Sequence, residues 1–290
     1  MTRLVLPLPG SEALGEGLAR ALRADLREIE SRRFPDGETY VRLPTEVEGR
    51  EVVLVCTLAN PDEQALRLLF SARTARELGA ASVTLVAPYL AYMRQDARFQ
   101  PGEAVTSRHF AELVSREVDR LVTVDPHLHR HASLGEIYAI PAEAVRAAPL
   151  IADWIAANVA APLVVGPDSE SDQWVSEVAE RAGAPYVVLR KERHGDRDVD
   201  ISAPDLAAWA GRTPVLVDDI VSSGRTMIEA ARRLVDQGFP APVCVAVHPL
   251  FADDAFAELS RLASRIVSTD TVPHPTNAIS VVPRIAEALA

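Results

Sequence analysis

Short runs of apolar, mostly β-branched residues alternate along this chain with longer stretches of helical periodicity. This alternation is typical of a parallel sheet with helices on its faces, because strands buried on both sides carry near-continuous apolar sequence. We predict strands at 4–8, 51–57, 82–88, 120–125, 162–168, 185–191, 213–219 and 242–249. We predict helices at 11–23, 61–79, 106–117, 170–182, 225–237 and 251–264. The sequence therefore predicts an α/β fold.

A further helical pattern at 140–160 separates two halves that each hold four of the eight predicted strands. A chain of 290 residues is long enough for two domains of ordinary size, each with its own core. We therefore expect an N-terminal α/β domain at 1–145 and a C-terminal α/β domain at 146–290, whose last helix could pack back on the N-terminal domain.

Charge and composition exclude several classes of protein. The net charge of −11 argues against nucleic-acid binding, which needs a broad basic surface, but permits a local basic pocket for a small anion. No apolar run approaches the roughly 18 residues of a membrane helix, and the apolar N-terminal stretch is too short for a signal peptide. Cys56 and Cys244 lie in apolar runs, as buried thiols of a reducing compartment do. We expect a cytoplasmic protein that binds neither nucleic acid nor membrane.

The strongest local motif is VLVDDIVSSGRTM at 215–227, in which an apolar strand leads through two acids and a turn of small residues into a helix. Such a turn leaves backbone amides free to bind phosphate, and its hydroxyls add donors. The paired acids could hold sugar hydroxyls or metal-bound water. The plainer alternative is a strand–turn–helix joint with solvated acids and a serine cap. The candidate binding residues are Asp218, Asp219, Ser222, Ser223, Gly224 and Thr226.

These residues match the phosphoribosyl-pyrophosphate signature, and four further segments resemble those of ribose-phosphate diphosphokinases (phosphoribosyl pyrophosphate synthetases). The segments are RRFPDGETYVRL at 32–43, PYLAYMRQDARF at 88–99, TVDPHLH at 123–129 and VVLRKERHGDRDVDI at 187–201. They occur in the family's order over nearly the whole chain. The chain resembles the short archaeal-like form of the family. The resemblance implies two phosphoribosyltransferase-like domains related by a pseudo-repeat, with the active site between them. It also implies the reaction of ATP with ribose 5-phosphate to give AMP and 5-phosphoribosyl 1-diphosphate, with Mg²⁺.

The resemblance assigns the ATP side to the N-terminal domain and the ribose 5-phosphate side to the C-terminal domain. Phe34, Asp36 and Glu38 would complete the ATP site of a neighbouring subunit, which implies a homo-oligomer, a dimer or higher. Arg94 and Gln95 would bind ATP within the same subunit. From the residues alone, Phe34 is as readily a core side chain, and Arg94–Gln95 a surface pair on a loop.

His127 alternates with two further histidines at 129 and 131, so an extended chain would place all three on one face, as in a metal-binding strand. Zinc would need three converging ligands, and the following residues offer no obvious cysteine or acid. The resemblance instead places His127 beside the magnesium of the nucleotide, with Asp168 as a second metal ligand.

The chain contains 29 arginines and a single lysine, Lys191. A codon bias toward arginine explains the 29 arginines. One interpretation of the exception is that position 191 requires a compact ammonium and not a planar guanidinium, and the alternative is that the lysine has no function. The resemblance places Lys191 and Arg193 in a loop that closes over the phosphates, where their charges would stabilise the transferring diphosphoryl group. Without that resemblance the segment is equally a solvated charged hairpin.

The chain departs from the family pattern after Asp168, where Ser-Glu-Ser-Asp at 169–172 replaces small residues that are often glycine. It also carries Ser222 where many members have an acid, and Arg225 where they have glycine. Two alternatives follow. A phosphoribosyltransferase would share the 215–227 turn but would not need the segments at 34–38 and 94–95. A non-catalytic regulatory paralogue is favoured by the 169–172 turn and opposed by the retained lysine.

Overall fold

The computed structural model describes residues 2–128, 130–193, 199–202 and 206–290. The chain divides into two compact units, each of which is described by itself. The first comprises Met1–Arg146 with Thr271–Pro273 and Val281–Ala290, and the second comprises Ala147–Asp270 with His274–Ser280. The C-terminal segment therefore belongs to the first unit. No helix in the described ranges has the length and apolar character needed to cross a membrane.

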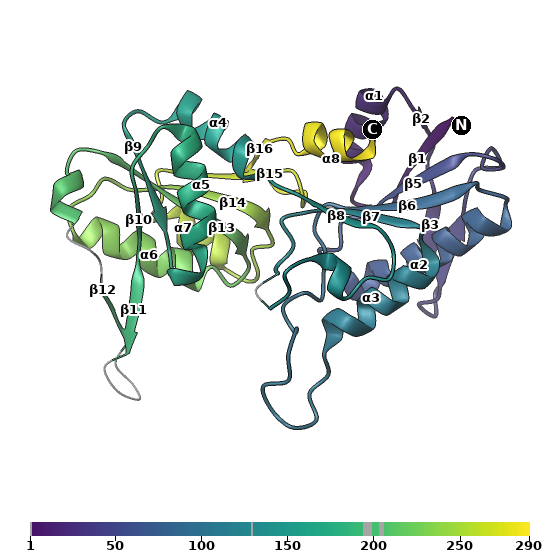
Figure 1. The fold of residues 1–290 in the computed structure, drawn as a ribbon, viewed down its shortest axis with the longest axis horizontal. Coiled ribbons are helices and arrows are strands. Elements are labelled where there is room, and N and C mark those ends of the chain that lie inside the picture. Colours follow the sequence, from purple (N-terminus) through teal and green to yellow (C-terminus); the bar gives the residue numbers. More distant parts are fainter. Residues whose placement is uncertain (1, 129, 194–198, 203–205) are drawn as a thin grey trace. The chain divides into compact units, whose positions relative to one another are not determined.

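The first unit is built on a six-stranded sheet in which every pairing is parallel. Its order is β2 (Asp25–Leu26), β1 (Arg3–Pro7), β5 (Glu51–Val55), β6 (Ser82–Ala87), β7 (Arg120–Val124) and β8 (Ala142–Val145). Helices α1 (Glu12–Leu22) and α8 (Val282–Leu289) cover one face, and α2 (Pro61–Glu77) and α3 (Thr106–Glu117) cover the other (Figure 1). A short 3₁₀ turn, η1 (Leu134–Glu136), precedes β8.

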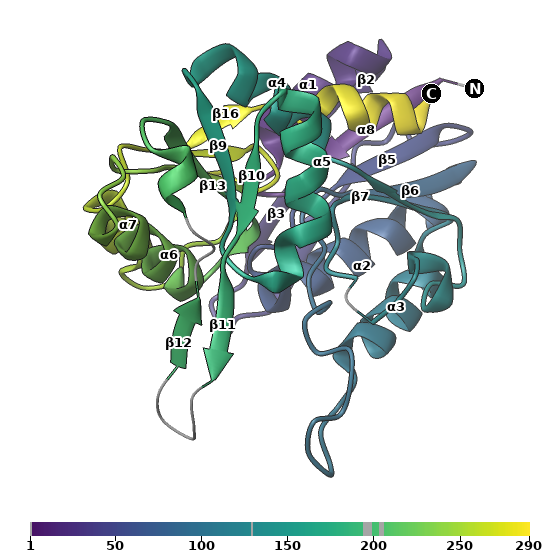
Figure 2. The same cartoon turned by 60° about the vertical axis from the view of Figure 1, so that its left-hand side comes forward.

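The second unit also has an all-parallel six-stranded sheet. Its order is β10 (Tyr186–Val188), β9 (Pro162–Gly166), β13 (Thr213–Val221), β14 (Val243–Pro249), β15 (Arg265–Thr269) and β16 (Asn277–Ile279). The helices are α4 (Ala148–Asn158), α5 (Asp172–Ala182), α6 (Arg225–Asp236) and α7 (Ala255–Ser260), with 3₁₀ turns η2 (Ser169–Ser171) and η3 (Leu206–Trp209). Figure 2 shows β9, β10 and β13 between the α4–α5 pair and the α6–α7 pair.

The two sheets have the same topology. Counted along the chain, the strands of each sheet lie in the order 2-1-3-4-5-6. Each unit also inserts an antiparallel hairpin between its second and third sheet strands. These hairpins are β3 (Glu30–Arg33) with β4 (Thr39–Arg42), and β11 (Arg190–Arg193) with β12 (Val199–Ser202). The predicted α/β fold, with two domains related by a pseudo-repeat, is confirmed.

The number of strands differs from the prediction, since each sheet has six strands rather than four. Four sheet strands were missed. The short edge strands β2, β8 and β16 were missed because only two to four residues pair and several of their side chains are exposed, which breaks the apolar pattern. The inner strand β15 was missed as well, and its buried residues are limited to a run of three. The predicted helix at 251–264 is also too long. Helix α7 spans only Ala255–Ser260, and the chain then turns into β15.

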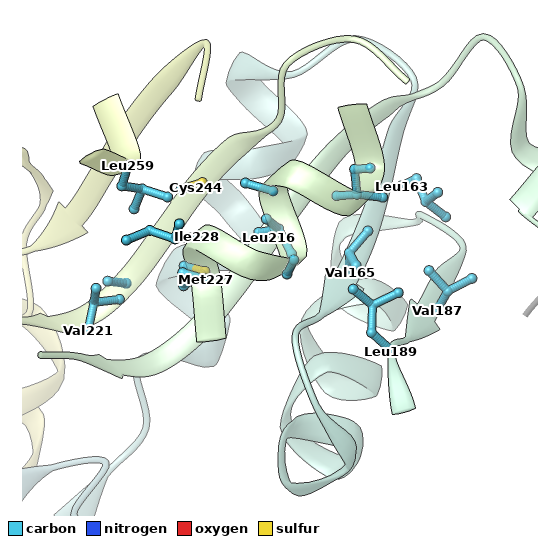
Figure 3. Packing of buried hydrophobic residues seen from close by; sticks show 14 of the residues in the cluster. Leu163, Val165, Val187, Leu189, Leu216, Val221, Met227, Ile228, Cys244 and Leu259 are labelled. Atoms are coloured by element: carbon cyan, nitrogen blue, oxygen red, sulfur yellow. The ribbon is translucent and has the colours of Figure 1, made fainter. Parts of the chain in front are cut away.

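The core of the second unit fixes the place where β13 passes into α6. Leu163, Leu216 and Cys244 come from neighbouring strands and are at most 1% exposed, and Met227 and Ile228 of α6 pack on them (Figure 3). Burial of such side chains stabilises the fold by about 1.5–3 kcal/mol each. The first turn of α6 is therefore anchored to the sheet directly beside the end of β13.

Candidate active site

The strand order of the second sheet reverses between β9 and β13, and this is where open α/β sheets bind ligands. Strand β9 ends at Gly166, so Asp168 follows its carboxyl end, while Asp218 and Asp219 lie near the carboxyl end of β13. Val165 pairs with Leu216 in parallel register. The three acids therefore share one edge of the sheet.

The three carboxylates influence one another. Burial raises the pKa of Asp218 well above its usual value, and the negative charges of Asp219 and then Asp168 raise it further. Asp218 Oδ1 accepts the Asp219 N–H at 3.0 Å, and Asp219 Oδ1 accepts the Ile220 N–H at 2.7 Å. Such crowded carboxylates favour a ligand that brings hydroxyl donors or a cation.

The turn after β13 requires a glycine. Gly224 has φ +66°, and a Cβ there would lie 3.2 Å from Ala255 Cβ and 3.3 Å from Ile228 Cδ1. Helix α6 begins at the next residue, and the Ile228 N–H donates to the Gly224 carbonyl at 2.8 Å. The first amides of a helix have no acceptor within it, so this turn presents N–H groups at the positive end of α6.

Two hydroxyls beside that turn are half-buried, those of Ser222 and Thr226, whereas Ser223 is exposed. The loop after β14 holds the turn in place. The Phe251 N–H donates to the Val221 carbonyl at 2.9 Å, and the Ala252 N–H donates to the Ser222 carbonyl at 3.0 Å. The arrangement of rigid amides and hydroxyls suits a phosphate group.

The unusual 169–172 segment forms the 3₁₀ turn η2 and then the start of α5. The Ser171 hydroxyl donates to the Asp168 carbonyl at 2.6 Å. A Cβ at Gly166 would collide with the oxygen of that hydroxyl. Asp172 stands in the first turn of α5, where its negative charge is stabilised by the helix dipole. The serine that breaks the family pattern therefore fills the space above Gly166.

The hairpin β3–β4 carries the predicted Phe34, Asp36 and Glu38 on an exposed tip. The Phe34 N–H donates to the Glu38 carbonyl at 2.8 Å, and the Gly37 N–H donates to the Phe34 carbonyl at 2.9 Å. Gly37 has φ +95°, which the turn requires. Phe34 is 38% exposed, so it is not a core residue.

One face of the Phe34 ring is already occupied. The Arg32 guanidinium lies over the Phe34 ring at 4.7 Å from its centroid and over the Tyr40 ring at 4.3 Å. The two rings meet edge to face with centroids 6.0 Å apart. Arg32 and Tyr40 were not singled out from the sequence, because only the pairing of β3 with β4 places Arg32 beside Tyr40.

Arg94 and Gln95 lie in the segment that follows β6, and His127 lies in the one that follows β7. These two strands are parallel neighbours, so both segments start from the same edge of the first sheet. Arg94 is exposed, and Gln95 and His127 are half-buried. The Gln95 carbonyl accepts the Ser107 N–H at 3.3 Å.

The alternating histidines at 127, 129 and 131 do not form a metal site within the described residues. His131 Nδ1 lies 3.1 Å from Glu136 Oε2, and residue 129 lies outside the described ranges. No group of three histidine, cysteine or acidic side chains suited to a metal ion occurs in the described part of the chain. A metal at Asp168 or His127 therefore has no complete set of ligands among the described residues, and substrate or water could supply others.

The predicted catalytic residues lie in β11. This strand pairs with β12, so that Lys191 is opposite Ile201 and Arg193 is opposite Val199. The side chains of Lys191 and Arg193, and the residues 194–198 between the two strands, lie outside what the structure describes.

Comparisons with known proteins agree with this geometry. Residues 4–117 match the N-terminal domain of ribose phosphate pyrophosphokinase, and residues 133–274 match the phosphoribosyl transferase domain. The fold and the acid–glycine turn are thus those of a protein built from phosphoribosyltransferase-type domains. A ribose-phosphate pyrophosphokinase of Methanopyrus kandleri is 40% identical over 291 residues, which covers 99% of this chain and 98% of the relative. The chain belongs to the ribose-phosphate pyrophosphokinase family.

Two more comparisons extend this result. A ribose-phosphate pyrophosphokinase of Halobacterium salinarum is 35% identical, with 99% of this chain and 100% of the relative covered. The crystal structure of phosphoribosylpyrophosphate synthetase from Mycobacterium smegmatis superposes with a TM-score of 0.85 at 23% identity, covering 100% of this chain and 98% of that one. The family and fold predicted from the sequence are confirmed.

Proposed function

We propose that this protein is a ribose-phosphate pyrophosphokinase that transfers the diphosphoryl group of ATP to the 1-hydroxyl of ribose 5-phosphate. The products are AMP and 5-phosphoribosyl 1-diphosphate. The observation that carries the proposal is the acid pair Asp218–Asp219 at the end of β13, followed at once by the glycine turn that opens α6. One strand–turn–helix unit therefore offers carboxylates that can accept hydrogen bonds from sugar hydroxyls, together with amides and hydroxyls that can donate hydrogen bonds to a phosphate.

Ribose 5-phosphate binds at the carboxyl edge of the second sheet. The amides of the Ser222–Gly224 turn, with the Ser222, Ser223 and Thr226 hydroxyls, hold the 5-phosphate. Asp218 and Asp219 accept hydrogen bonds from the ribose hydroxyls. Each hydrogen bond to the phosphate contributes about 1.5–3 kcal/mol because one partner is charged. Ribose hydroxyls also supply hydrogen-bond donors to the Asp218 carboxyl, whose pKa is raised by burial and then by the charges of Asp219 and Asp168.

ATP, the diphosphoryl donor of the family, binds residues of the first domain. Phe34 stacks on adenine through the ring face that Arg32 leaves open, and Asp36 and Glu38 accompany it on the exposed hairpin tip. Arg94 and Gln95 grip the nucleotide from the segment after β6. Since the hairpin tip is exposed, it is also suited to complete the ATP site of a second copy in a homo-oligomer.

Magnesium fits the residues present. Asp168 contributes to the repulsion at Asp218, which a divalent cation relieves, and His127 offers an imidazole on the ATP side. Magnesium is commonly held by one or two protein groups together with substrate phosphates, so a complete protein cage is not required. When bound, it neutralises the charge of the transferring diphosphoryl group. The positive charges of Lys191 and Arg193 stabilise the negative charge on that group in the transition state.

The free thiols of Cys56 and Cys244 are buried, which is consistent with a reducing cytoplasm.

The deciding experiment supplies ATP, ribose 5-phosphate and Mg²⁺ and measures AMP and 5-phosphoribosyl 1-diphosphate. Asp219→Asn should abolish product, whereas Asp236→Asn, at the exposed end of α6, should leave it unchanged. Absence of product with the parent protein would refute the proposal and would favour a regulatory paralogue.

The oligomer is tested by complementation. Glu38→Ala and Lys191→Ala chains should each be inactive alone, and mixed oligomers should regain activity if one subunit's hairpin serves its neighbour. Verified mixed oligomers without activity would mean that each subunit holds a whole ATP site.

A further inference from the structure

Tyr92, two residues before Arg94, has a backbone conformation that aromatic residues rarely adopt. Its φ is +62°, in the left-handed region where the Cβ atom crowds the backbone. Such a conformation persists only where the surrounding structure imposes it, and it recurs at functional sites. The residue lies in the segment between β6 and α3, which carries the proposed ATP ligands.

Two helices hold Tyr92 in place. Its hydroxyl donates to a carboxylate oxygen of Asp62, in the first turn of α2. Its ring packs on Phe110 of α3, with centroids 4.7 Å apart and planes inclined by 47°. The Thr106 hydroxyl, at the start of α3, also lies 3.5 Å from the Tyr92 carbonyl oxygen. Side chain and backbone are thus fixed by contacts remote in sequence.

The residues around the proposed ATP ligands are fixed as well. Met93 is 2% exposed, and the buried carboxylate of Asp96 pairs with Arg130 at 3.2 Å. Between these two anchors lie Arg94, which is exposed, and Gln95, which is half-buried. The left-handed turn at Tyr92 therefore decides in which direction the chain enters the Arg94–Gln95 pair.

We infer that Tyr92 is a positioning residue of the ATP site, and that its bond to Asp62 sets the placement of Arg94 and Gln95. This rests on the proposed role of those two residues. Tyr92 remains a donor throughout the neutral range, because burial and then Asp62 raise its pKa to about 12. A purely structural role would instead lower stability and leave the affinity for ATP unchanged relative to that for ribose 5-phosphate.

The test uses Tyr92→Phe, which keeps the ring on Phe110 and removes the hydroxyl. We expect the KM for ATP to rise about 3- to 10-fold. This is less than the full effect of a hydrogen bond to a charged group, because Tyr92 acts on ATP only through Arg94 and Gln95. The KM for ribose 5-phosphate should stay within about twofold of the parent value. Asp62→Ala should have the same effect, and the double variant should be no worse than either single one, since both remove one interaction.

Tyr138→Phe is the matched control. Tyr138 lies in the same domain and is 4% exposed, and its hydroxyl has no partner within the described residues. Its removal should leave both KM values unchanged. An unchanged KM for ATP in Tyr92→Phe, or an equal rise in both KM values, would overturn the inference.

Direct calorimetric titration with ATP separates this inference from the proposed function. A parent protein that binds ATP but forms no product would refute the function while the Tyr92→Phe comparison of Kd still tests the positioning role. If Tyr92→Phe fails to fold, Asp62→Ala is titrated instead, because it removes the acceptor of the bond and leaves Tyr92 unchanged. An ATP Kd equal to the parent value in that variant would also overturn the inference.

Discussion

Replacing Gly224 by alanine should destabilise the second domain for two separate reasons. The first is its φ of +66°, which an L-residue adopts at a cost of about 1–2 kcal/mol, partly offset because alanine restricts the unfolded chain. The second is the space around the new Cβ, which would lie 3.2 Å from Ala255 Cβ and 3.3 Å from Ile228 Cδ1. Overpacking of this kind costs about 1–3 kcal/mol. The expected loss of unfolding free energy is about 2–4 kcal/mol.

Gly183 supplies the matched control within the same domain. Its φ is +63°, close to that of Gly224, but a Cβ there meets no described heavy atom within 4 Å. Gly183→Ala should therefore lose only the backbone part, about 1 kcal/mol. The difference between the two variants measures the packing cost alone.

Urea unfolding followed by tryptophan fluorescence reads out this comparison. The three tryptophans, at positions 154, 174 and 209, all belong to the second unit, so the signal reports on the domain that carries both glycines. Gly224→Ala should also raise the KM for ribose 5-phosphate, whereas Gly183→Ala should not. Equal losses of stability in the two variants, or an unchanged KM in Gly224→Ala, would refute the close fit of the turn against α7.

Three further changes have defined outcomes. Thr226→Val should raise the KM for ribose 5-phosphate about 10- to 100-fold, as loss of one hydrogen bond to a phosphate requires, and an unchanged value would remove Thr226 from the site. Lys191→Arg should lower kcat about 10²- to 10³-fold with little change in either KM, and parent-like turnover would end its catalytic assignment. Arg73→Met should destabilise the protein at pH 7, because the hydrogen bond from Arg73 lowers the pKa of the Glu117 carboxyl, which is 6% exposed. That stabilisation exists above the ordinary Glu pKa of 4.5 and disappears as the pH falls through the lowered value, so denaturation midpoints of parent and variant should converge in acid.

The central strands were predictable because burial on both faces leaves a continuous apolar run. Strand β5 is EVVLV and β14 is VCVAVHP, and in both nearly every residue is buried. Strand β8, AEAV, has two exposed residues of four, and its place in the sheet depends on pairing with β7. Because that pairing is a long-range contact, no local pattern in the sequence indicates it.

The candidate site likewise has a part that local sequence predicts and a part that depends on contacts remote in sequence. The segment from Asp218 to Thr226 was identifiable because acids, turn and helix start are contiguous, and its roles remain predictions. The closeness of Asp168 to Asp218 depends on how β9 pairs with β13, which no local pattern indicates. The left-handed backbone of Tyr92 has no sequence signal at all, since only glycine, asparagine and aspartate commonly adopt it.

The pseudo-repeat raises the question of why the proposed phosphate turn lies in the second domain and not at the equivalent position of the first. In each sheet the third strand, β5 or β13, ends beside the position where the strand order reverses. After β5, the Thr57 N–H already donates to Ser11 Oγ at 2.9 Å, and the Thr57 hydroxyl donates to the Thr271 carbonyl at 2.8 Å. These groups are therefore satisfied within the protein.

The helices that follow the two strands differ in charge. Helix α2 begins with Pro61, which has no N–H, and carries Asp62 and Glu63 in its first turn, so an incoming phosphate would meet two carboxylates. Helix α6 begins with Arg225 and Thr226 and has no acid in its first turn. The same topology thus gives a helix start suited to an anion in the second domain and one unsuited to an anion in the first. In the first domain Asp62 instead accepts the Tyr92 hydroxyl, so the carboxylate that repels phosphate from α2 is used to shape the segment proposed to bind ATP.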